Sequence, residues 1–256
     1  MGFQMPDILN KVEKAIPFRK FADEGVNSEA LTYAYPCENY ISIVVSNPAS
    51  KYSLKKFFDS KIKSEIDSIV KESIEVTQKT FPRIYLIFKN CCEKLNILRF
   101  PKIAISMRLR GINSLTVGTD ENPIILVSPL AASRLKNSEL SFLIGHELGH
   151  VAQGNLICHT VKGALDTFSK WSDALGPIVA DVIEVPLNRW YRCSEFTSDR
   201  AGLICCGDLM VALGVFNKVS NGSKDRLTVW DNFMELSSDH PTLKNRIEEL
   251  KKFRLI

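Results

Sequence analysis

Apolar residues recur at helical spacing in several stretches of the chain. From Ser53 to about Lys79 they fall every three or four residues, which is the spacing of a helix that buries one face. The positions are Leu54, Phe57, Phe58, Ile62, Ile66, Ile69, Val70 and Ile74. Pro82 breaks the pattern, because proline cannot continue a helix interior. A second helix is predicted from about Arg83 to Leu95.

Short runs rich in β-branched residues predict strands. "NYISIVVSN" lies between Pro36 and Pro48, and "PKIAISMR" and "NPIILVSP" lie on either side of the turn-rich "GTDEN". "GINSLTVG" alternates small or polar residues with Leu115 and Val117, which is typical of a half-exposed edge strand. The alternative for this segment is an ordinary internal strand.

The second half of the chain is predominantly helical. Asn137–Ser138 offers a helix N-cap, and the helix is predicted to continue to Gly154. Another helix is predicted from near Arg192 past Leu203, and a final one after Pro241. Strands first and helices second predict an α+β fold with its site between helices.

Composition and charge exclude several functional classes. The chain has 256 residues, 45% of them apolar, which is enough for a substantial core. Its net charge is only +4, and acidic and basic residues interleave along predicted helices, so we expect no nucleic-acid partner. No run approaches the about 18 to 20 apolar residues of a transmembrane helix, so we expect a soluble protein.

The cysteines suggest a compartment. Seven are present, an odd number, and none forms a C-x-x-C motif, so neither a disulfide framework nor a thiolate zinc site is indicated. The N-terminus does not resemble a signal peptide. We therefore expect buried free thiols and a cytoplasmic location.

The segment "SFLIGHELGHVAQG" carries two of the four histidines of the chain. His146 and His150 are four residues apart, so both imidazoles leave the same helix face and can clamp a tetrahedral metal, for which Zn²⁺ is the usual occupant. Glu147 points beside that clamp and can take a proton from a metal-bound water as general base. The sequence thus predicts metal-assisted hydrolysis with one zinc ion per chain; the alternative is coincidence on a core helix.

A third ligand must come from elsewhere in the chain. Gln153 and Leu156 stand where the metzincin pattern requires glycine and histidine, which excludes that solution. "RCSEFTSDRAG" offers Glu195 and Asp199 on one helix face. Glu195 would complete a His₂Glu site and Asp199 would accept the spare N–H of a ligating histidine. The alternative is a solvated pair of acids beside neighbouring arginines.

Four blocks together resemble the HtpX and CAAX-prenyl-protease group of gluzincin metallopeptidases. They are "INSLTVGTDENPIILVSPLAASRL", "ELSFLIGHELGHV", "EFTSDRAG" and "SSDHPTLKNRIEEL", in this order. The resemblance implies a zincin-like fold with a small, mostly antiparallel sheet packed on the HExxH helix. It also implies zinc ligation by His146, His150 and Glu195, with Glu147 as the base and Asp199 beside the ligands.

The last block matches the family's His-Pro…Arg element through His240 and Arg246. His240 is a candidate donor to an oxyanion, with helix-entry structure as the alternative, and Tyr191 is a second candidate donor. His159 matches no motif, so we expect a surface position or one behind the ligands. Cys37 could cap zinc as an inhibitory thiolate, although no known pro-segment motif surrounds it.

By the same resemblance, a peptide substrate would pair with the strand that contains Asn113, Ser114, Leu115 and Thr116. Ser114 stands where the family usually has alanine, a difference that puts none of the implied chemistry in doubt. Many family members are integral membrane proteins; because this chain shows no such helices, a membrane-embedded substrate is not expected.

The leading hypothesis is a soluble zinc-dependent endopeptidase acting on proteins or peptides. The alternative is a non-catalytic zinc-fold binding protein or holdase, against which the intact Glu147 argues. Residues 81–256 are predicted to form the catalytic domain, preceded by an extension of unmatched type at 1–80. The sequence gives no indication of the oligomeric state.

Overall fold

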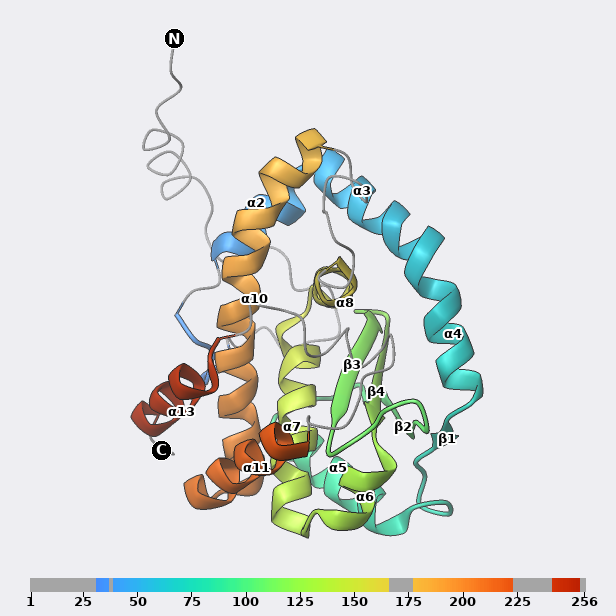
Figure 1. Ribbon diagram of the computed structural model, residues 1–256, viewed down its shortest axis with the longest axis vertical. Coiled ribbons are helices and arrows are strands. Elements are labelled where there is room, and N and C mark those ends of the chain that lie inside the picture. Colours follow the sequence, from blue (N-terminus) through green and yellow to red (C-terminus); the bar gives the residue numbers. More distant parts are fainter. Residues whose placement is uncertain (1–30, 37–38, 166–176, 223–240, 254–256) are drawn as a thin grey trace.

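The computed structural model describes residues 31–36, 39–165, 177–222 and 241–253 (Figure 1). Within them the chain is a mixed α+β structure, mostly helical, with one four-stranded sheet. The elements are α2 (Asn39–Ser46), α3 (Pro48–Phe57), the π-helical η1 (Phe58–Ile62), α4 (Lys63–Lys71), β1 (Ile74–Glu75), α5 (Pro82–Lys94), β2 (Lys102–Ile105), β3 (Ser114–Thr119), β4 (Asn122–Val127), α6 (Pro129–Arg134), α7 (Asn137–Gln153), α8 (Leu156–Leu165), α10 (Pro177–Cys206), α11 (Leu209–Gly222) and α13 (Leu243–Lys252).

The sheet has the strand order β1-β2-β4-β3. The β1/β2 and β3/β4 pairs are antiparallel and the β2/β4 pair is parallel, which confirms a mostly antiparallel sheet. β3 is an edge strand, in register with β4 from Ser114 opposite Val127. The β3/β4 hairpin needs a glycine at position 118, because φ there is +112° and a Cβ would lie 2.3 Å from the carbonyl oxygen of Asn122.

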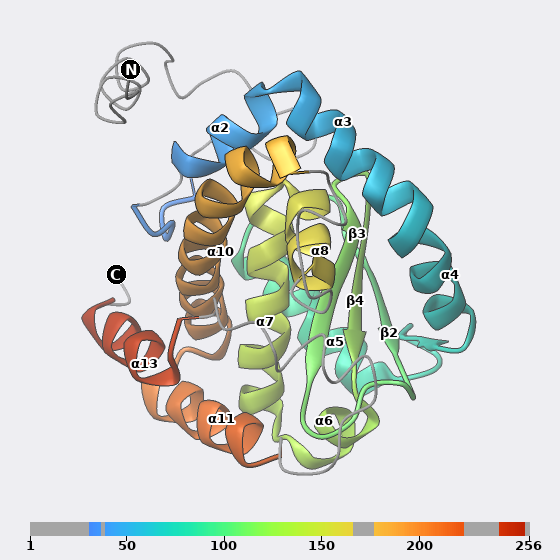
Figure 2. The ribbon, with the colours of Figure 1, turned by 45° about the horizontal axis from the view of Figure 1, so that its top comes forward.

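The sheet lies between α7 on one side and the continuous run α3, η1 and α4 on the other (Figures 1 and 2). The alternation of side chains along β3 matches this arrangement. Ser114 and Thr116 face α7, where both hydroxyls meet Glu147. Leu115 and Val117 belong to the hydrophobic cluster that contains buried residues of α3, η1 and α4. The strand is therefore buried on both faces while it remains at the edge of the sheet.

The predicted strand at 39–47 is wrong, because this segment forms helix α2. Helix α2 packs against α10 (Figure 1). Val44, in the same cluster as Leu187 and Trp190 of α10, is 1% exposed. β-propensity is a weak preference, and burial of an apolar helix face overrides it here. The cluster also joins residues 44–69 to α8 and β3, and the division of the chain at residue 80 stays a prediction.

Two helix boundaries also differ from the prediction. The helix expected to reach Lys79 ends at Lys71, and Ile74–Glu75 instead pairs with β2. The helix expected to begin near Arg192 starts at Pro177 and contains Pro186 in its interior. The predicted helices at 83–95 and 137–154 correspond closely to α5 and α7.

The expectation that the cysteines are buried free thiols is partly wrong. Cys91, Cys92, Cys158 and Cys205 are free and buried, and burial raises the pKa of the Cys158 thiol to about 12. Cys193, however, takes part in a disulfide bond, so it is not the free thiol that was expected. The inference of a reducing compartment loses that support.

Across the described ranges, no helix combines the length and the apolarity that a membrane crossing requires.

Helices α7 and α10 pack together unusually closely, through glycines. A Cβ at Gly149 of α7 would lie 2.6 Å from the Cα of Ser198, and one at Gly145 would lie 2.6 Å from the Cβ of Cys205. On the other helix, a Cβ at Gly202 would lie 2.8 Å from the carbonyl oxygen of Phe142. Each of these contacts is closer than real Cβ atoms come, so the two helix backbones could not approach this far with any larger residue.

We expect Gly149→Ala to destabilise the protein by about 1–3 kcal/mol, because the added methyl group forces the two helices apart. The variant should also lose bound metal, since that separation moves α10 away from His146 and His150. Urea unfolding and metal analysis measure both effects. Gly214→Ala on α11 is the control, because nothing lies within 4 Å of a Cβ there. An unchanged unfolding midpoint in Gly149→Ala would contradict the close approach.

Candidate metal centre

Helix α7 presents the histidine pair. Its N-cap residue is Lys136, one residue before the predicted cap, and the side chain of Glu139 in the first turn accepts the main-chain N–H of Lys136 at 3.0 Å. The spacing then sets His146 and His150 on one face, as predicted. The side chain of His146 is 12% exposed and that of His150 is 4% exposed.

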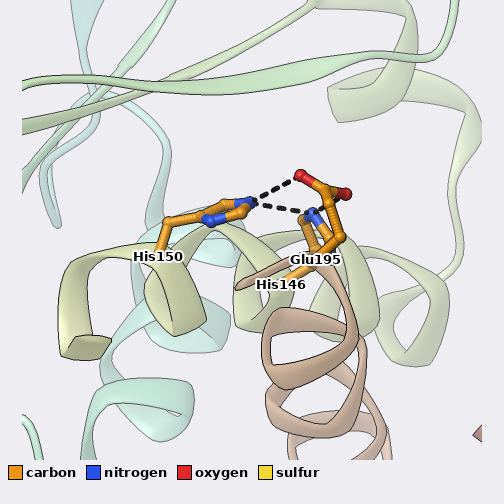
Figure 3. A group of neighbouring side chains, drawn as sticks. All are labelled: His146, His150 and Glu195. Atoms are coloured by element: carbon orange, nitrogen blue, oxygen red, sulfur yellow. Dashed lines mark hydrogen bonds and ion pairs between the residues drawn. The ribbon is translucent and has the colours of Figure 1, made fainter. Parts of the chain in front are cut away.

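The two histidines and Glu195 of α10 converge on one point (Figure 3). The two Nε2 atoms lie 3.2 Å apart, and the carboxylate oxygens of Glu195 lie 3.4 Å from Nε2 of His150 and 3.7 Å from Nε2 of His146. Ligand atoms at about 2.0–2.1 Å from a tetrahedral zinc are separated by about 3.3–3.4 Å. The donor set and its spacing therefore fit a zinc ion.

Asp199 lies behind the first histidine, one turn along α10 from Glu195. Its Oδ1 is 3.0 Å from Nδ1 of His146. This contact leaves Nε2 of His146 free to face the centre and fixes the plane of the ring. The predicted alternative of a solvated acid pair is wrong, because Glu195 is 2% exposed and Asp199 is 1% exposed.

Arg246 of α13 completes the charge arrangement. Its Nε donates to Oδ2 of Asp199 at 2.8 Å and Nη2 donates to Oδ1 at 2.5 Å, while Nη1 lies 3.2 Å from Oε2 of Glu195. Buried carboxylates need such partners, because an unpaired buried charge is strongly destabilising. Arg246 thus holds both acids of α10 in place through charge-assisted hydrogen bonds.

The electrostatics follow from this burial. Burial lowers the pKa of His146, but the hydrogen bond with Asp199 and the charges of Glu195 and Asp199 raise it more, so the pKa lies above its usual 6.5. Burial likewise lowers the pKa of Arg246, and the same two carboxylates outweigh that effect and raise it. The centre therefore favours positive charge, as a cation site must.

Glu147 faces β3 from the buried side of α7. Ser114 Oγ donates to its Oε1 at 2.7 Å, and Thr116 Oγ1 donates to its Oε2 at 2.6 Å. Serine at position 114, where the family usually has alanine, thus places a hydroxyl on the predicted base. Asn113 is also near, and its Oδ1 accepts the main-chain N–H of Ser114 at 2.8 Å.

One buried residue near the centre had no motif to signal it. His159 of α8 is 6% exposed, and its ring centroid lies 4.1 Å from that of His150. Its ring also stacks on that of Tyr191, with the centroids 5.1 Å apart. It lies behind His150 because α8 folds back beside α7, which no local spacing indicates.

Two predicted residues cannot be placed. His240 and Cys37 lie outside the described residues, so the oxyanion and capping roles considered for them stay predictions. The same holds for a donor role of Tyr191, whose ring packs as described.

Comparison with known proteins adds two findings. Residues 78–254, well over half of the chain, match peptidase family M48. The chain is also 32% identical over 118 residues to the plastoglobule-localized metallopeptidase 48, chloroplastic, of Arabidopsis thaliana. That match covers 45% of this chain and 34% of the relative, so the chain spans about a third of that protein's length.

We expect Asp199→Asn to weaken zinc affinity by about 10- to 100-fold. The neutral amide supplies no negative charge to the N–H of His146 or to the guanidinium of Arg246. Competition with a zinc chelator measures this affinity. Glu184→Gln, an exposed acid on the same helix, is the matched control and should leave affinity unchanged. Equal affinities of the two variants would contradict the role given to Asp199.

Proposed function

We propose that this chain, which belongs to peptidase family M48, is a zinc-dependent endopeptidase acting on proteins or peptides. The observation that carries the proposal is the convergence of His146, His150 and Glu195 at distances suited to one tetrahedral metal ion. The family membership supports a metallopeptidase; the zinc identity, one ion per chain and the endopeptidase activity are our inference.

In this proposal Glu147 is the general base. A zinc ion held by the three ligands would lower the pKa of a bound water and polarise the scissile carbonyl. Glu147, which follows the first ligand directly, takes the proton of the attacking water and passes it to the leaving amine. The buried position of its carboxylate supports this role, because a water-poor site strengthens each charge interaction.

Asp199 and Arg246 serve the ligands. Asp199 holds His146 in the orientation that directs Nε2 to the metal, and Arg246 holds Asp199 and Glu195 in position. Tyr191 or His240 would supply the donor to the oxyanion, a role that the proposal leaves to these two candidates.

The substrate would pair with the free edge of β3. The main-chain N–H of Gly118 donates to Thr160 of α8, and Thr160 donates back to its carbonyl, so the main-chain groups of Gly118 point away from β4. Along a strand of an antiparallel pair, the main-chain N–H and C=O groups of successive residues point alternately toward the paired strand and away from it. Ser114 and Thr116 therefore also direct their main-chain groups to the free edge, and α8 closes that edge at Gly118. A peptide would pair beside Ser114 and Thr116, directly over the base.

The remaining expectations belong to the same proposal. The hydrogen bonds between β3 and Glu147 support a zincin-like architecture, with the sheet against the HExxH helix. Residues 81–256 would form the catalytic domain. The relative's name gives a plastoglobule location for that protein, and the cytoplasmic location expected for this chain stays a prediction.

Glu147→Gln should retain zinc and fold normally while peptide hydrolysis falls about 10²- to 10⁴-fold, because the amide keeps the shape of the base without its proton acceptance. Digestion of a peptide library by zinc-loaded wild type and variant tests this. Zinc binding without hydrolysis by the wild type would contradict the proposal and favour the non-catalytic zinc-binding alternative.

Thr116→Pro should raise the KM for peptides at least tenfold, because proline has no N–H to offer the substrate at the free edge. Thr116→Val is the matched control: it keeps the main-chain N–H and should keep the KM. Leu115→Pro should instead unfold the protein, since the N–H of Leu115 faces β4. Steady-state kinetics and circular dichroism separate these outcomes, and an unchanged KM in a folded Thr116→Pro would exclude this edge as the substrate strand.

A further inference from the structure

The carboxylate of Glu147 is held by two hydroxyls of β3, one on each oxygen. Ser114 Oγ lies 2.7 Å from Oε1, and Thr116 Oγ1 lies 2.6 Å from Oε2. All three residues are buried, with exposed fractions of 3% for Ser114, 0% for Thr116 and 5% for Glu147. A buried carboxylate requires hydrogen-bond donors, and here both come from one strand.

We propose that Ser114 and Thr116 are positioning residues that fix the Glu147 carboxylate between the metal ligands and the bound peptide. The inference rests on the proposed function, because it assigns these residues to the same catalytic site. Each hydroxyl acts through Glu147.

The geometry explains why two hydroxyls suit this task. A glutamate side chain has three rotatable bonds. If the base is held in one orientation before the reaction, the entropy cost of fixing these bonds does not add to the activation free energy. A hydroxyl can donate to a carboxylate and accept from a carboxylic acid, so the same pair can hold Glu147 before and after it takes a proton. Thr116 Oγ1 also lies 3.1 Å from the main-chain oxygen of Glu147. When the Glu147 carboxyl group is protonated, the Thr116 hydroxyl can donate to this main-chain oxygen instead.

The same strand carries both parts of the reaction. The main chain of Ser114 and Thr116 faces the free edge proposed for the peptide, and their side chains hold the base. When a peptide pairs with this edge, β3 therefore positions both the scissile bond and the carboxylate of Glu147. Position 114 is the place at which the resemblance leads one to expect alanine, so the hydroxyl there is a feature of this chain.

The test compares Ser114→Ala, Thr116→Val and their combination with the wild type, all zinc-loaded. We expect kcat to fall about tenfold in each single variant and about 100-fold in the double variant, the size expected for a misplaced reacting group. KM and zinc content should stay within twofold. Thr116→Ser restores the hydroxyl and should restore kcat. Ser106→Ala is the control, because Ser106 is 1% exposed and its Oγ has no hydrogen-bond partner within the described part of the chain.

A second measurement does not depend on activity. Thr116→Val should lower the urea unfolding midpoint more when Glu147 is present than when Glu147 is replaced by alanine, because the contact with the carboxylate is then already absent and only the bond to the main-chain oxygen of residue 147 is left to lose. Equal shifts in both backgrounds would overturn the contact. An unchanged kcat in the double variant of an active enzyme would overturn the positioning role alone. A zinc-loaded wild type that cuts no peptide would overturn the proposed function and this role with it.

Discussion

The close approach of α7 and α10 is the constraint on which the centre depends. The candidate ligands come from two helices distant in sequence, so these helices must pack closely for the donor atoms to meet. Gly149 is the neighbour of His150 in sequence. The atom closest to a Cβ placed at Gly149 would be the Cα of Ser198, which is the neighbour of Asp199. The close glycine contacts and the residues of the candidate metal site are thus neighbours along the same crossing of α7 and α10. A larger residue at the crossing would therefore move the candidate ligands apart.

Charge is the second constraint. The crossing buries two carboxylates, and burial of uncompensated charge would cost more than the packing contributes. Arg246 reaches both acids from α13, and His146 shares a hydrogen bond with Asp199. The arrangement leaves the Nε2 atoms and the carboxylate of Glu195 turned toward one another, a juxtaposition that suits a bound cation better than an empty interior. The helix that follows Pro241 is therefore part of the centre, although it contributes no ligand.

Strand β3 links the core, the base and the free edge of the sheet. Its apolar side chains enter the cluster beneath α3 and α4, and its hydroxyls reach Glu147 on the other side. Because both faces are covered, the strand is held in place even though, among the described residues, no other strand pairs with one of its edges. α8 limits that edge through Thr160 and also brings His159 against His150. One short helix thus shapes both the edge proposed for the substrate and the surroundings of a candidate ligand.

The sequence by itself determined the local features. The spacing of His146, Glu147 and His150, the helix that carries them and the acid pair at Glu195 and Asp199 follow from helical periodicity, which depends on neighbouring residues alone. The family resemblance added Arg246. Periodicity could not identify α2 as a helix, because its β-branched residues favour a strand until α10 buries them. It could not indicate the roles of Gly149, Ser114 or His159 either. Each of these depends on which distant backbone or side chain lies opposite, and only the tertiary structure decides that.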